Sequence, residues 1–389
     1  MLSRRLMLRT GLVVVSWLAF FQIMHRRPPY LSDTSYTGAV KNSYTEKEGF
    51  SACLFFKDDN ERLVEWIAYH FHVLDLRYLI VGVDYNSVTS PDAILHRWNQ
   101  TGRIQTYIWN TSTITPVDKL ESLNSRQIHF DFACLQEMKR VNRSWVTIID
   151  TDEYITFNRF SFEDPSLREL NFSRNATTAR DNLIRARTRL PITGGDTTAY
   201  SFIQQESDNL PWAYQSCVPM FRLQFGLRET PISQLERKED IEVLFPAGYN
   251  TTDYYTTRYF QHRPKGECNK NCKGKTIMDV SRIPDDHLIH PDYDPPGGAT
   301  TSCGVHNPVP ECNGTLVPEY ATSIFRVHHY LESVETVISR NIQHGSSKMK
   351  KFNWYKGLQS EPELEASYWL KHFVANVGEQ DARFLLSKP

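Results

Sequence analysis

Residues 145–154 read Trp-Val-Thr-Ile-Ile-Asp-Thr-Asp-Glu-Tyr, and this stretch decides the fold that we expect. Its first half is a short apolar run typical of a buried strand, and the run leads directly into acidic residues. Asp150 and Asp152 are two residues apart, so in an extended chain both carboxylates point to one side. Carboxylates beside a core need a partner, and two oxygen ligands on one side suit Mg²⁺ or Mn²⁺. The alternative is a capped turn whose acids are solvated.

Strands and helices alternate in the residues on the N-terminal side of this stretch. Apolar runs predict strands at 50–56, 78–83 and 104–109. Helices are predicted at 63–74, at 91–98, which Gly102 closes, and at 126–141. This alternation predicts parallel βαβ units, in which a ligand lies beyond the carboxyl ends of the strands. We therefore expect an α/β fold with a mostly parallel sheet flanked by helices.

The pattern weakens after about residue 160. Pro, Gly and polar segments interrupt short apolar runs such as 217–225, which predicts short strands and loops. The last stretch, residues 361–386, has the pattern of a helical segment.

The composition limits the class of partner. The chain has 389 residues, enough for one large domain or two ordinary ones. Lys and Arg number 44 and Asp and Glu 45, and this balance argues against nucleic acid as the main partner. Aromatic residues make up 12%, which suits surfaces that handle sugars and is also common in large cores.

An uncharged, mostly apolar segment lies near the N-terminus at residues 10–25. As a helix it spans about 24 Å, close to the roughly 30 Å of a bilayer core, and Arg9 and Arg26 can snorkel. We expect an uncleaved transmembrane anchor, because the bulky residues that follow offer no small-residue cleavage site; a cleaved signal peptide is the alternative. Residues 1–9 are then a cytosolic tail, and residues 26–48 are a stem.

Seven Asn-x-Ser/Thr sequons follow this segment, whereas chance gives roughly two or three. They lie at Asn99, Asn110, Asn142, Asn171, Asn175, Asn250 and Asn313. Their number and position predict that the chain after the anchor is lumenal and glycosylated.

The seven cysteines fit an oxidising compartment. Two pairs flank short polar loops and predict local disulfides, Cys268–Cys272 and Cys303–Cys312. Zinc binding is the alternative for these pairs. The other three lie in apolar contexts, which favours buried thiols or one long-range bridge: Cys53, Cys134 and Cys217.

A series of motifs runs through the chain in a fixed order. The first four are Lys57-Asp58-Asp59, Glu65-Trp66-Ile67-Ala68-Tyr69-His70, Asp84-Tyr85-Asn86-Ser87 and Asp150-Thr151-Asp152-Glu153-Tyr154. Two later ones are Gln224-Phe225-Gly226 and His328-His329-Tyr330 with Ser333 and Arg340. Together, over roughly residues 50–340, they resemble the GT-A glycosyltransferases of the family-92 kind and their family-2-like relatives. This chain departs from the family at two places: it has Lys57-Asp58-Asp59 where members usually carry Lys-Asn-Glu, and Arg340 where the last motif position is often Lys.

The resemblance implies a metal site. Asp150 and Asp152 would hold Mn²⁺ (or Mg²⁺) and, through it, the diphosphate of a nucleotide-sugar donor. His329 would be the third metal ligand, and His328 and His290 are its rivals. For each histidine an ordinary structural role is the alternative.

The resemblance also implies contacts to the nucleotide. Asp84, and Asp58 or Asp59, would accept hydrogen bonds from the base or ribose, and the alternative for each is a helix cap or a turn. Arg340 would pair with phosphate as a fork, or else solvate a helix face.

An inverting transfer needs a carboxylate base that deprotonates the acceptor hydroxyl. Glu229 and Asp285 are our candidates, with Asp286 and Glu206 as rivals in the same half of the chain. Glu153 alternates away from the acidic pair, so we expect it to be structural.

From this resemblance we expect a Golgi type II membrane enzyme that transfers a sugar, from a UDP-sugar such as UDP-galactose, to a glycan acceptor. Residues 49–340 would form the GT-A catalytic domain, with a nucleotide-sugar half at 49–160 and an acceptor half at 161–340. Residues 341–389 would be a C-terminal helical extension, and a homodimer is compatible with this organisation. The alternatives are a lumenal sugar-phosphate transferase and a catalytically inactive glycan-binding protein on the same fold.

Overall fold

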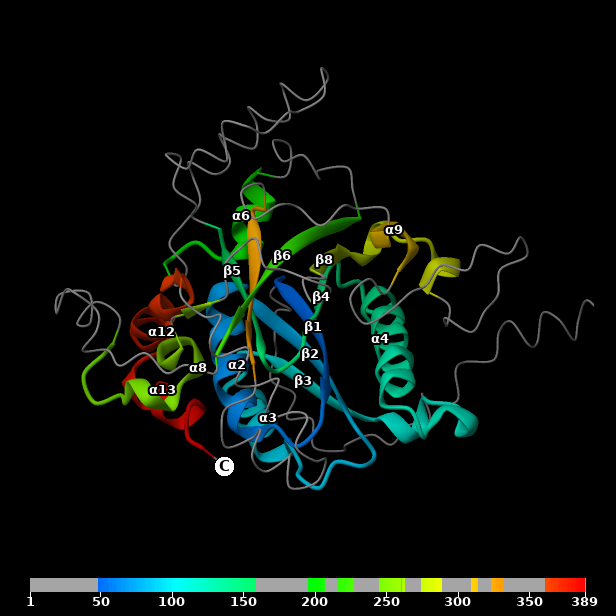
Figure 1. The fold of residues 1–389 in the computed structure, drawn as a ribbon, viewed down its shortest axis with the longest axis horizontal. Helices are drawn as coiled ribbons and strands as arrows, with labels where there is room; N and C mark the ends of the chain where they lie inside the picture. Colours follow the sequence, from blue (N-terminus) through cyan, green and yellow to red (C-terminus); the bar gives the residue numbers. More distant parts are fainter. Residues whose placement is uncertain are drawn as a thin grey trace, which may run out of the picture. The chain divides into compact units, whose positions relative to one another are not determined.

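The computed structural model describes residues 48–158, 195–206, 216–226, 245–259, 261–262, 274–288, 309–313, 323–331 and 361–388. Within these ranges the fold is α/β, with a mixed sheet and helices on both of its faces (Figure 1). The main path of the sheet runs β10-β7-β6-β8-β4-β1-β2-β3, and β9 joins β5 to β6.

The first half of the sheet is parallel, as the alternation of strands and helices predicts. Its elements are β1 (Phe50–Phe56), α2 (Asn60–Val73), β2 (Leu76–Val83), α3 (Asp92–Thr101), β3 (Gln105–Asn110), α4 (Leu123–Arg140) and β4 (Trp145–Ile148). β1 pairs in parallel with β2 and β4, and β2 pairs in parallel with β3. The carboxyl ends of these strands therefore meet at one edge of the sheet.

Two apolar layers cover this parallel half, one on each face. Trp66 and Ile67 of α2 pack with side chains such as Leu54 on one face of the sheet, and Phe130 of α4 packs on the other. Figure 1 shows α4 on one side of β1–β4 and α2 on the opposite side. A Cβ atom at Gly82 would lie 2.3 Å from Phe130 Cδ2, so only glycine leaves room for α4 there.

The second half of the sheet is mainly antiparallel, which corrects the expectation of a mostly parallel sheet. Its elements are β5 (Glu153–Phe157), α6 (Ala199–Glu206), β6 (Cys217–Phe225), β7 (Gln261–His262), β8 (Lys275–Asp279), β9 (Phe325–Tyr330) and β10 (Glu361–Pro362). β8 runs antiparallel between β4 and β6, β5 is antiparallel to β9, and β6 is parallel to β9. Antiparallel strands need no crossover helix, so the helical spacing that marked the first half is not required here.

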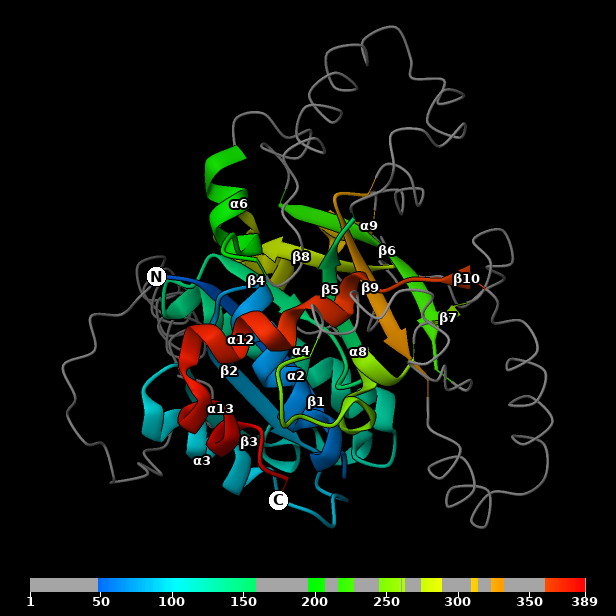
Figure 2. The same cartoon turned by 90° about the vertical axis from the view of Figure 1, so that its left-hand side faces the viewer.

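Short helices complete the described fold. They are η2 (Thr111–Thr113), η3 (Val117–Lys119), η6 (Thr251–Asp253), α8 (Tyr255–Arg258), η8 (Val280–Arg282), η9 (Asp285–Leu288), α9 (Pro310–Asn313), η10 (Glu365–Tyr368), α12 (Trp369–Val377) and α13 (Glu379–Leu385). The helical character predicted for residues 361–386 is confirmed from η10 to α13. Figure 2 shows α12 beside α2. Trp369 and Phe373 of α12 are fully buried and contact Tyr69 and Phe71 of α2, so this end of the chain shares the main core.

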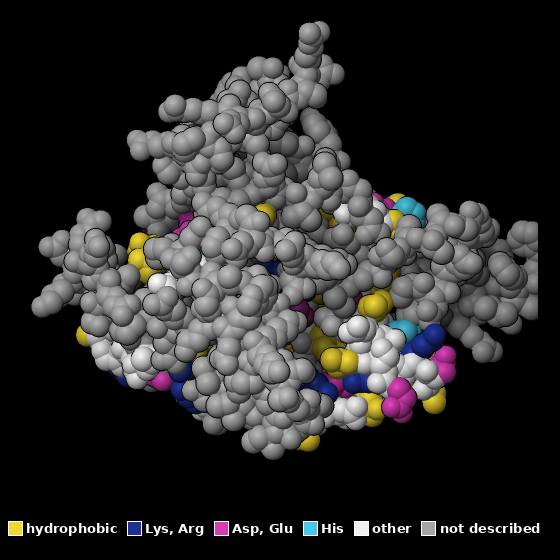
Figure 3. Space-filling view, viewed as in Figure 1, with side chains coloured by type: hydrophobic (Ala, Val, Ile, Leu, Met, Phe, Trp, Pro, Cys, Tyr) yellow, Lys and Arg dark blue, Asp and Glu magenta, His cyan; other side chains and the backbone are white. Residues whose placement is uncertain are grey.

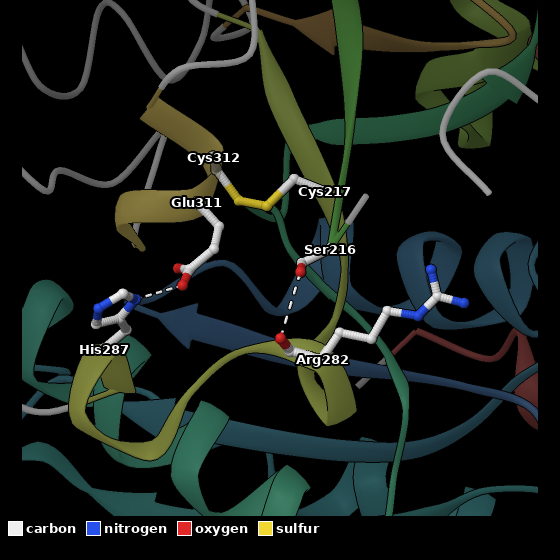
Figure 4. Close-up of a disulfide and its surroundings, with 6 residues drawn as sticks. All are labelled: Ser216, Cys217, Arg282, His287, Glu311 and Cys312. Carbon is white, nitrogen blue, oxygen red and sulfur yellow. Dashed lines mark hydrogen bonds and ion pairs between the residues drawn. A yellow bond between two sulfur atoms is a disulfide. The ribbon is translucent and has the colours of Figure 1, made fainter. Parts of the chain in front are cut away.

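Two disulfides hold these elements together. Cys53 of β1 is bonded to Cys134 of α4, which confirms the long-range bridge considered for the buried cysteines. Cys217 of β6 is bonded to Cys312 of α9, beside the pair of His287 and Glu311 (Figure 4).

The second disulfide shows that the predicted Cys303–Cys312 bond is wrong. Cys312 is fully buried next to Cys217 in the same apolar cluster. The partner of Cys312 is therefore determined by the packing of two distant segments, and not by the short polar loop between Cys303 and Cys312. Cys303 and the predicted pair Cys268–Cys272 lie outside the described residues.

The surface of the described residues mixes apolar and charged side chains. Large exposed apolar side chains are Tyr85, Val88, Tyr107, Ile108, Val117, Leu123 and Phe384. On the face drawn in Figure 3, apolar side chains lie in several separate places beside charged and polar ones. Such scattered residues are ordinary on protein surfaces.

In the part of the chain that the structure describes, no helix combines the length and the hydropathy that crossing a membrane requires. The predicted tail at 1–9, the predicted anchor at 10–25 and all but the last residue of the predicted stem lie outside that part.

Candidate functional site

The carboxyl ends of β1, β4 and β9 bring a group of acidic residues and one histidine together. Asp59 follows β1, Asp150 and Asp152 follow β4, and His329 lies near the end of β9. The Thr151 hydroxyl donates a hydrogen bond to Asp59, which links the first and fourth strands of the parallel half. The structure therefore clusters the acids that the sequence predicted for this edge, apart from Asp58 and Asp84, which it places in the neighbouring loops.

Asp152 and His329 form the centre of this cluster. The pairing of β5 with β9 sets Glu153 opposite His329, and this register brings His329 Nε2 to 3.2 Å from Asp152 Oδ2. Arg62 Nη1 lies 3.5 Å from the same oxygen. Burial alone would raise the pKa of Asp152, but His329 and Arg62 outweigh it and hold that pKa below its ordinary value.

The other oxygen of Asp152 has a different environment. Asp152 Oδ1 is buried and has no hydrogen-bond partner among the described residues, and the same is true of His329 Nδ1. A buried carboxylate oxygen without a partner is unfavourable, and a cation would relieve this.

Asp150 has a different environment from Asp152. Its carboxylate accepts hydrogen bonds from Gln127 Nε2 at 3.1 Å and from Lys275 Nζ at 3.1 Å. Lys275 also lies 3.1 Å from Glu153 Oε2, and Glu153 receives Arg222 Nη1 on its other oxygen at 3.0 Å. Burial lowers the pKa of Lys275, but Asp150 and Glu153 raise it above its ordinary value, so the ammonium stays charged.

Glu153 is the support of this arrangement, as its alternation away from the acidic pair predicts. It is fully buried, and its Oε2 accepts a hydrogen bond from the Asp150 backbone N–H at 3.0 Å. Its carboxylate therefore fixes the turn that carries Asp150.

Two of the three acids proposed for nucleotide contacts, Asp84 and Asp58, are paired within the protein. Asp84 is buried and forms a fork with Arg126, with Nε 2.9 Å from Oδ1 and Nη2 3.0 Å from Oδ2. Asp58 has a positive φ of 53°, and its Oδ1 accepts the backbone N–H groups of Val88 at 2.7 Å and Thr89 at 2.8 Å. Both acids thus organise the loop after β2, which is the turn role weighed as the alternative.

Arg126 connects this loop to the surface. Its guanidinium lies 4.9 Å from the centre of the Tyr85 ring, which is 39% exposed. The Asp84 fork holds Arg126 in place, so a partly exposed aromatic ring lies beside a fixed cation at the end of β2.

Other predicted residues do not join this cluster. Asp285 is 88% exposed on η9 and pairs with Lys139. Lys139 lies twelve residues after Gln127 on α4, about 18 Å along the helix, so the structure places Asp285 away from Asp150. The expectation that Asp285 acts as the base is corrected accordingly, and the rival Asp286 lies beside it on the same short helix.

Two further rivals have structural surroundings. His328 is fully buried against Phe225, with ring centres 4.3 Å apart, and burial lowers its pKa well below the ordinary value. Glu206 is buried on α6. Glu229, His290 and Arg340 lie outside the described residues.

The cluster also contains residues that the sequence patterns did not indicate. Lys275 begins β8, and Arg222 lies within β6, so each is a cation in an apolar strand. A buried cation at such a position needs an acid nearby, so a Lys or Arg within an apolar run is the sequence feature that could indicate these two residues. The sequence carries no such signal for Arg62 and Asp131, because their helical spacing resembles that of ordinary surface charges.

Asp131 of α4 is buried beside Lys275 and Asp150. Neither of its carboxylate oxygens has a hydrogen-bond partner in the described ranges. Burial raises the pKa of Asp131 well above its ordinary value, and Asp150 adds to this while Lys275 opposes it.

The donor set partly fits a divalent cation. In the described part of the chain, no group of three or more His, Cys, Asp or Glu side chains is arranged to hold a metal ion. Asp152 and His329 still offer a carboxylate oxygen without a partner and an imidazole beside it. Mg²⁺ and similar cations often use one or two protein ligands together with phosphate oxygens and water, so these two residues fit such a site.

Comparison of the sequence with models of known protein families gave no match, and comparison with curated proteins gave none either.

Proposed function

We propose that this protein is a metal-dependent glycosyltransferase that moves a sugar from a nucleotide-sugar donor to a glycan acceptor. The observation that carries the proposal is the Asp152–His329 pair, with its buried unpartnered oxygen, at the edge where parallel strands end. Ligands of α/β sheets bind at this edge. When bound there, a divalent cation neutralises charge on a leaving diphosphate.

The chain's own groups have separate tasks in this proposal. Asp152 and His329 hold the cation, and Arg62 keeps Asp152 in place from the buried side. The exposed ring of Tyr85 beside Arg126 offers a surface on which a nucleotide base can stack. Lys57, which is half-exposed and 3.7 Å from Asp84, supplies a second positive charge toward a phosphate.

We place the catalytic base, a carboxylate, in the acceptor half of the chain at residues 161–340. β6 runs parallel to β9, with Phe225 opposite Tyr330, so the carboxyl end of β6 lies beside the end of β9 that carries His329. Glu229 follows Gly226 by three residues in the sequence, and we therefore retain it as the base that deprotonates the acceptor hydroxyl.

The remaining parts of the proposal come from the sequence and the resemblance. They are a UDP-sugar donor such as UDP-galactose, inversion at the transferred sugar, and a Golgi type II membrane protein with its catalytic region in the lumen. The sequons and the disulfides Cys53–Cys134 and Cys217–Cys312 agree with an oxidising lumenal compartment.

A screen of nucleotide sugars for turnover tests this function. The purified protein is incubated with each donor, with a glycan mixture, and with Mn²⁺ or chelator, and the released nucleotide is identified. We expect one UDP-sugar to release UDP with Mn²⁺, and we expect Asp152→Asn to lower the rate at least a hundredfold. Asp285→Asn is the matched control, because this acid is exposed and lies away from the cluster.

Three results would contradict the proposal. Release of UMP in place of UDP would identify a sugar-phosphate transferase. Glycan binding without turnover of any donor would identify an inactive binding protein. Full turnover in the presence of chelator would show that the reaction does not depend on a metal ion.

A further inference from the structure

We infer that Lys275 is a positioning residue that sets the charge of the site, so that the site favours a divalent cation bound together with a nucleoside diphosphate over the cation alone. This inference rests on the proposed function and deepens it. One buried lysine would then explain why Asp150 is neutralised within the protein whereas Asp152 keeps an oxygen for a cation.

Lys275 is built into the sheet at a fixed place. It begins β8, which runs antiparallel to β4, and its side chain is only 1% exposed. Its ammonium bridges Asp150 Oδ2 and Glu153 Oε2 at 3.1 Å each. Because Glu153 is also held by Arg222, this bridge cannot easily turn away from Asp150.

The bridge divides the acidic pair into two roles. The oxygens of Asp150 already accept Lys275 and Gln127, whereas Asp152 keeps one buried oxygen without a partner in the described residues. Asp152 and His329 can therefore bind a cation directly. Asp150 remains 41% exposed at the rim, where it is neutralised by Lys275.

The charge of the cluster follows from its members. With His329 counted as the neutral imidazole that a metal ligand requires, four carboxylates face three fixed cations, which leaves one net negative charge. The members are Asp59, Asp150, Asp152 and Glu153 with Arg62, Arg222 and Lys275. Asp131 adds no fixed charge when it is protonated, as a buried carboxyl without a partner should be. Without Lys275 the net charge would be two negative units.

This charge decides which ligand combination is favoured. One net negative charge attracts a divalent cation modestly, and the loaded site is then positive and attracts a diphosphate. Removal of Lys275 would strengthen the attraction for the cation and weaken that for the diphosphate. A merely structural lysine would weaken both, because its loss would disorder Asp150 and Glu153 together.

A series of charge variants tests this inference in the full chain. Mn²⁺ affinity is measured without nucleotide by calorimetry or by electron paramagnetic resonance, and UDP affinity is then measured at saturating Mn²⁺. For Lys275→Met we expect Mn²⁺ to bind about tenfold more tightly and UDP about tenfold more weakly. For Glu153→Gln, which keeps the side-chain volume and moves the charge the other way, we expect the opposite changes.

Two further variants serve as controls. The double variant Lys275→Met with Glu153→Gln restores the net charge, so both affinities should return to within about threefold of the wild type. Lys139→Met removes a lysine from the far end of α4 and should change neither affinity. If Lys275→Met does not fold, Glu153→Gln alone tests whether the affinities for Mn²⁺ and UDP change in opposite directions.

The outcomes separate this inference from the proposed function. Opposite movements of the two affinities, in the order of net charge, support it. Parallel losses in Lys275→Met and Glu153→Gln, or no change in either, overturn it while wild-type binding of Mn²⁺ and UDP upholds the metal–nucleotide site. A wild type that binds neither Mn²⁺ nor UDP overturns the proposed function, and this inference with it.

Discussion

Replacement of Glu65 by glutamine should remove a large part of the pH dependence of stability. Glu65 lies on α2 and is buried, and its carboxylate accepts the Tyr255 N–H at 2.6 Å and the Thr256 N–H and hydroxyl at 3.0 and 2.6 Å. Burial raises the pKa of Glu65 from 4.5 to about 7, although these donors oppose the rise.

The sign of the effect follows from the raised pKa. The native state holds the proton on Glu65 more tightly than the unfolded state does, so this contribution to stability is fully present below pH 4.5. It is lost as the pH rises through about 7. The difference between a pKa of 4.5 and one of about 7, at about 1.4 kcal/mol per pH unit, corresponds to about 3.5 kcal/mol of unfolding free energy.

Glu65→Gln stays neutral at every pH, and its amide oxygen can still accept both Thr256 donors, which share one oxygen of Glu65. The free energy of unfolding of the variant, relative to the wild type, should therefore rise by about 2–3 kcal/mol between pH 5 and pH 8. Urea unfolding followed by tryptophan fluorescence at four pH values measures this difference. Glu61→Gln, an exposed glutamate on the same helix, is the control and should leave the wild-type pH profile unchanged.

The reasoning would be refuted if Glu65→Gln had the wild-type pH slope. It would also be refuted if the variant's free energy of unfolding, taken relative to the wild type, fell between pH 5 and pH 8. In either case the three donors would outweigh burial, and Glu65 would be ionised in the native state.

Three further changes have definite expectations. Gly82→Ala should lower stability by about 2 kcal/mol, since its Cβ would meet Phe130 at 2.3 Å; an unchanged urea midpoint would contradict this packing. Loss of the Cys53–Cys134 bond, which closes a separation of 81 residues, should lower stability by about 4 kcal/mol, and alkylation of either cysteine without prior reduction would show that the bond is absent. Asp58→Ala should lower stability by about 1 kcal/mol, because two backbone N–H groups lose their acceptor; unaltered hydrogen exchange of those amides would argue against this role.

The parallel half of the fold could be predicted because its signals are local. Apolar runs such as 50–56 and the helical spacing at 63–74 reproduce β1 and α2 within a few residues. In the antiparallel half the apolar run 217–225 reproduces β6, but the order of the strands could not be predicted, because β8 is inserted between β4 and β6 by pairings with distant segments. No local pattern specifies such partners.

The candidate site divides in the same way. The acids after β4 could be located because buried strands that end in carboxylates are conspicuous in a sequence. Lys275, 125 residues away from Asp150, could not be paired with it from spacing alone. The partner of Cys312 could not be predicted for a related reason: Cys312 is bonded to Cys217, 95 residues away, and spacing does not reveal that the two are buried together.

The central claim is that Asp152 and His329 hold a cation that recruits a nucleoside diphosphate. Calorimetric titration of UDP into the protein, with Mn²⁺ and then with chelator, tests it most directly. We predict binding only with Mn²⁺, loss of that binding in Asp152→Asn, a smaller loss in His329→Ala, and wild-type binding in Asp285→Asn. Binding of UDP that persists in chelator, or that is unchanged by Asp152→Asn, would contradict the claim.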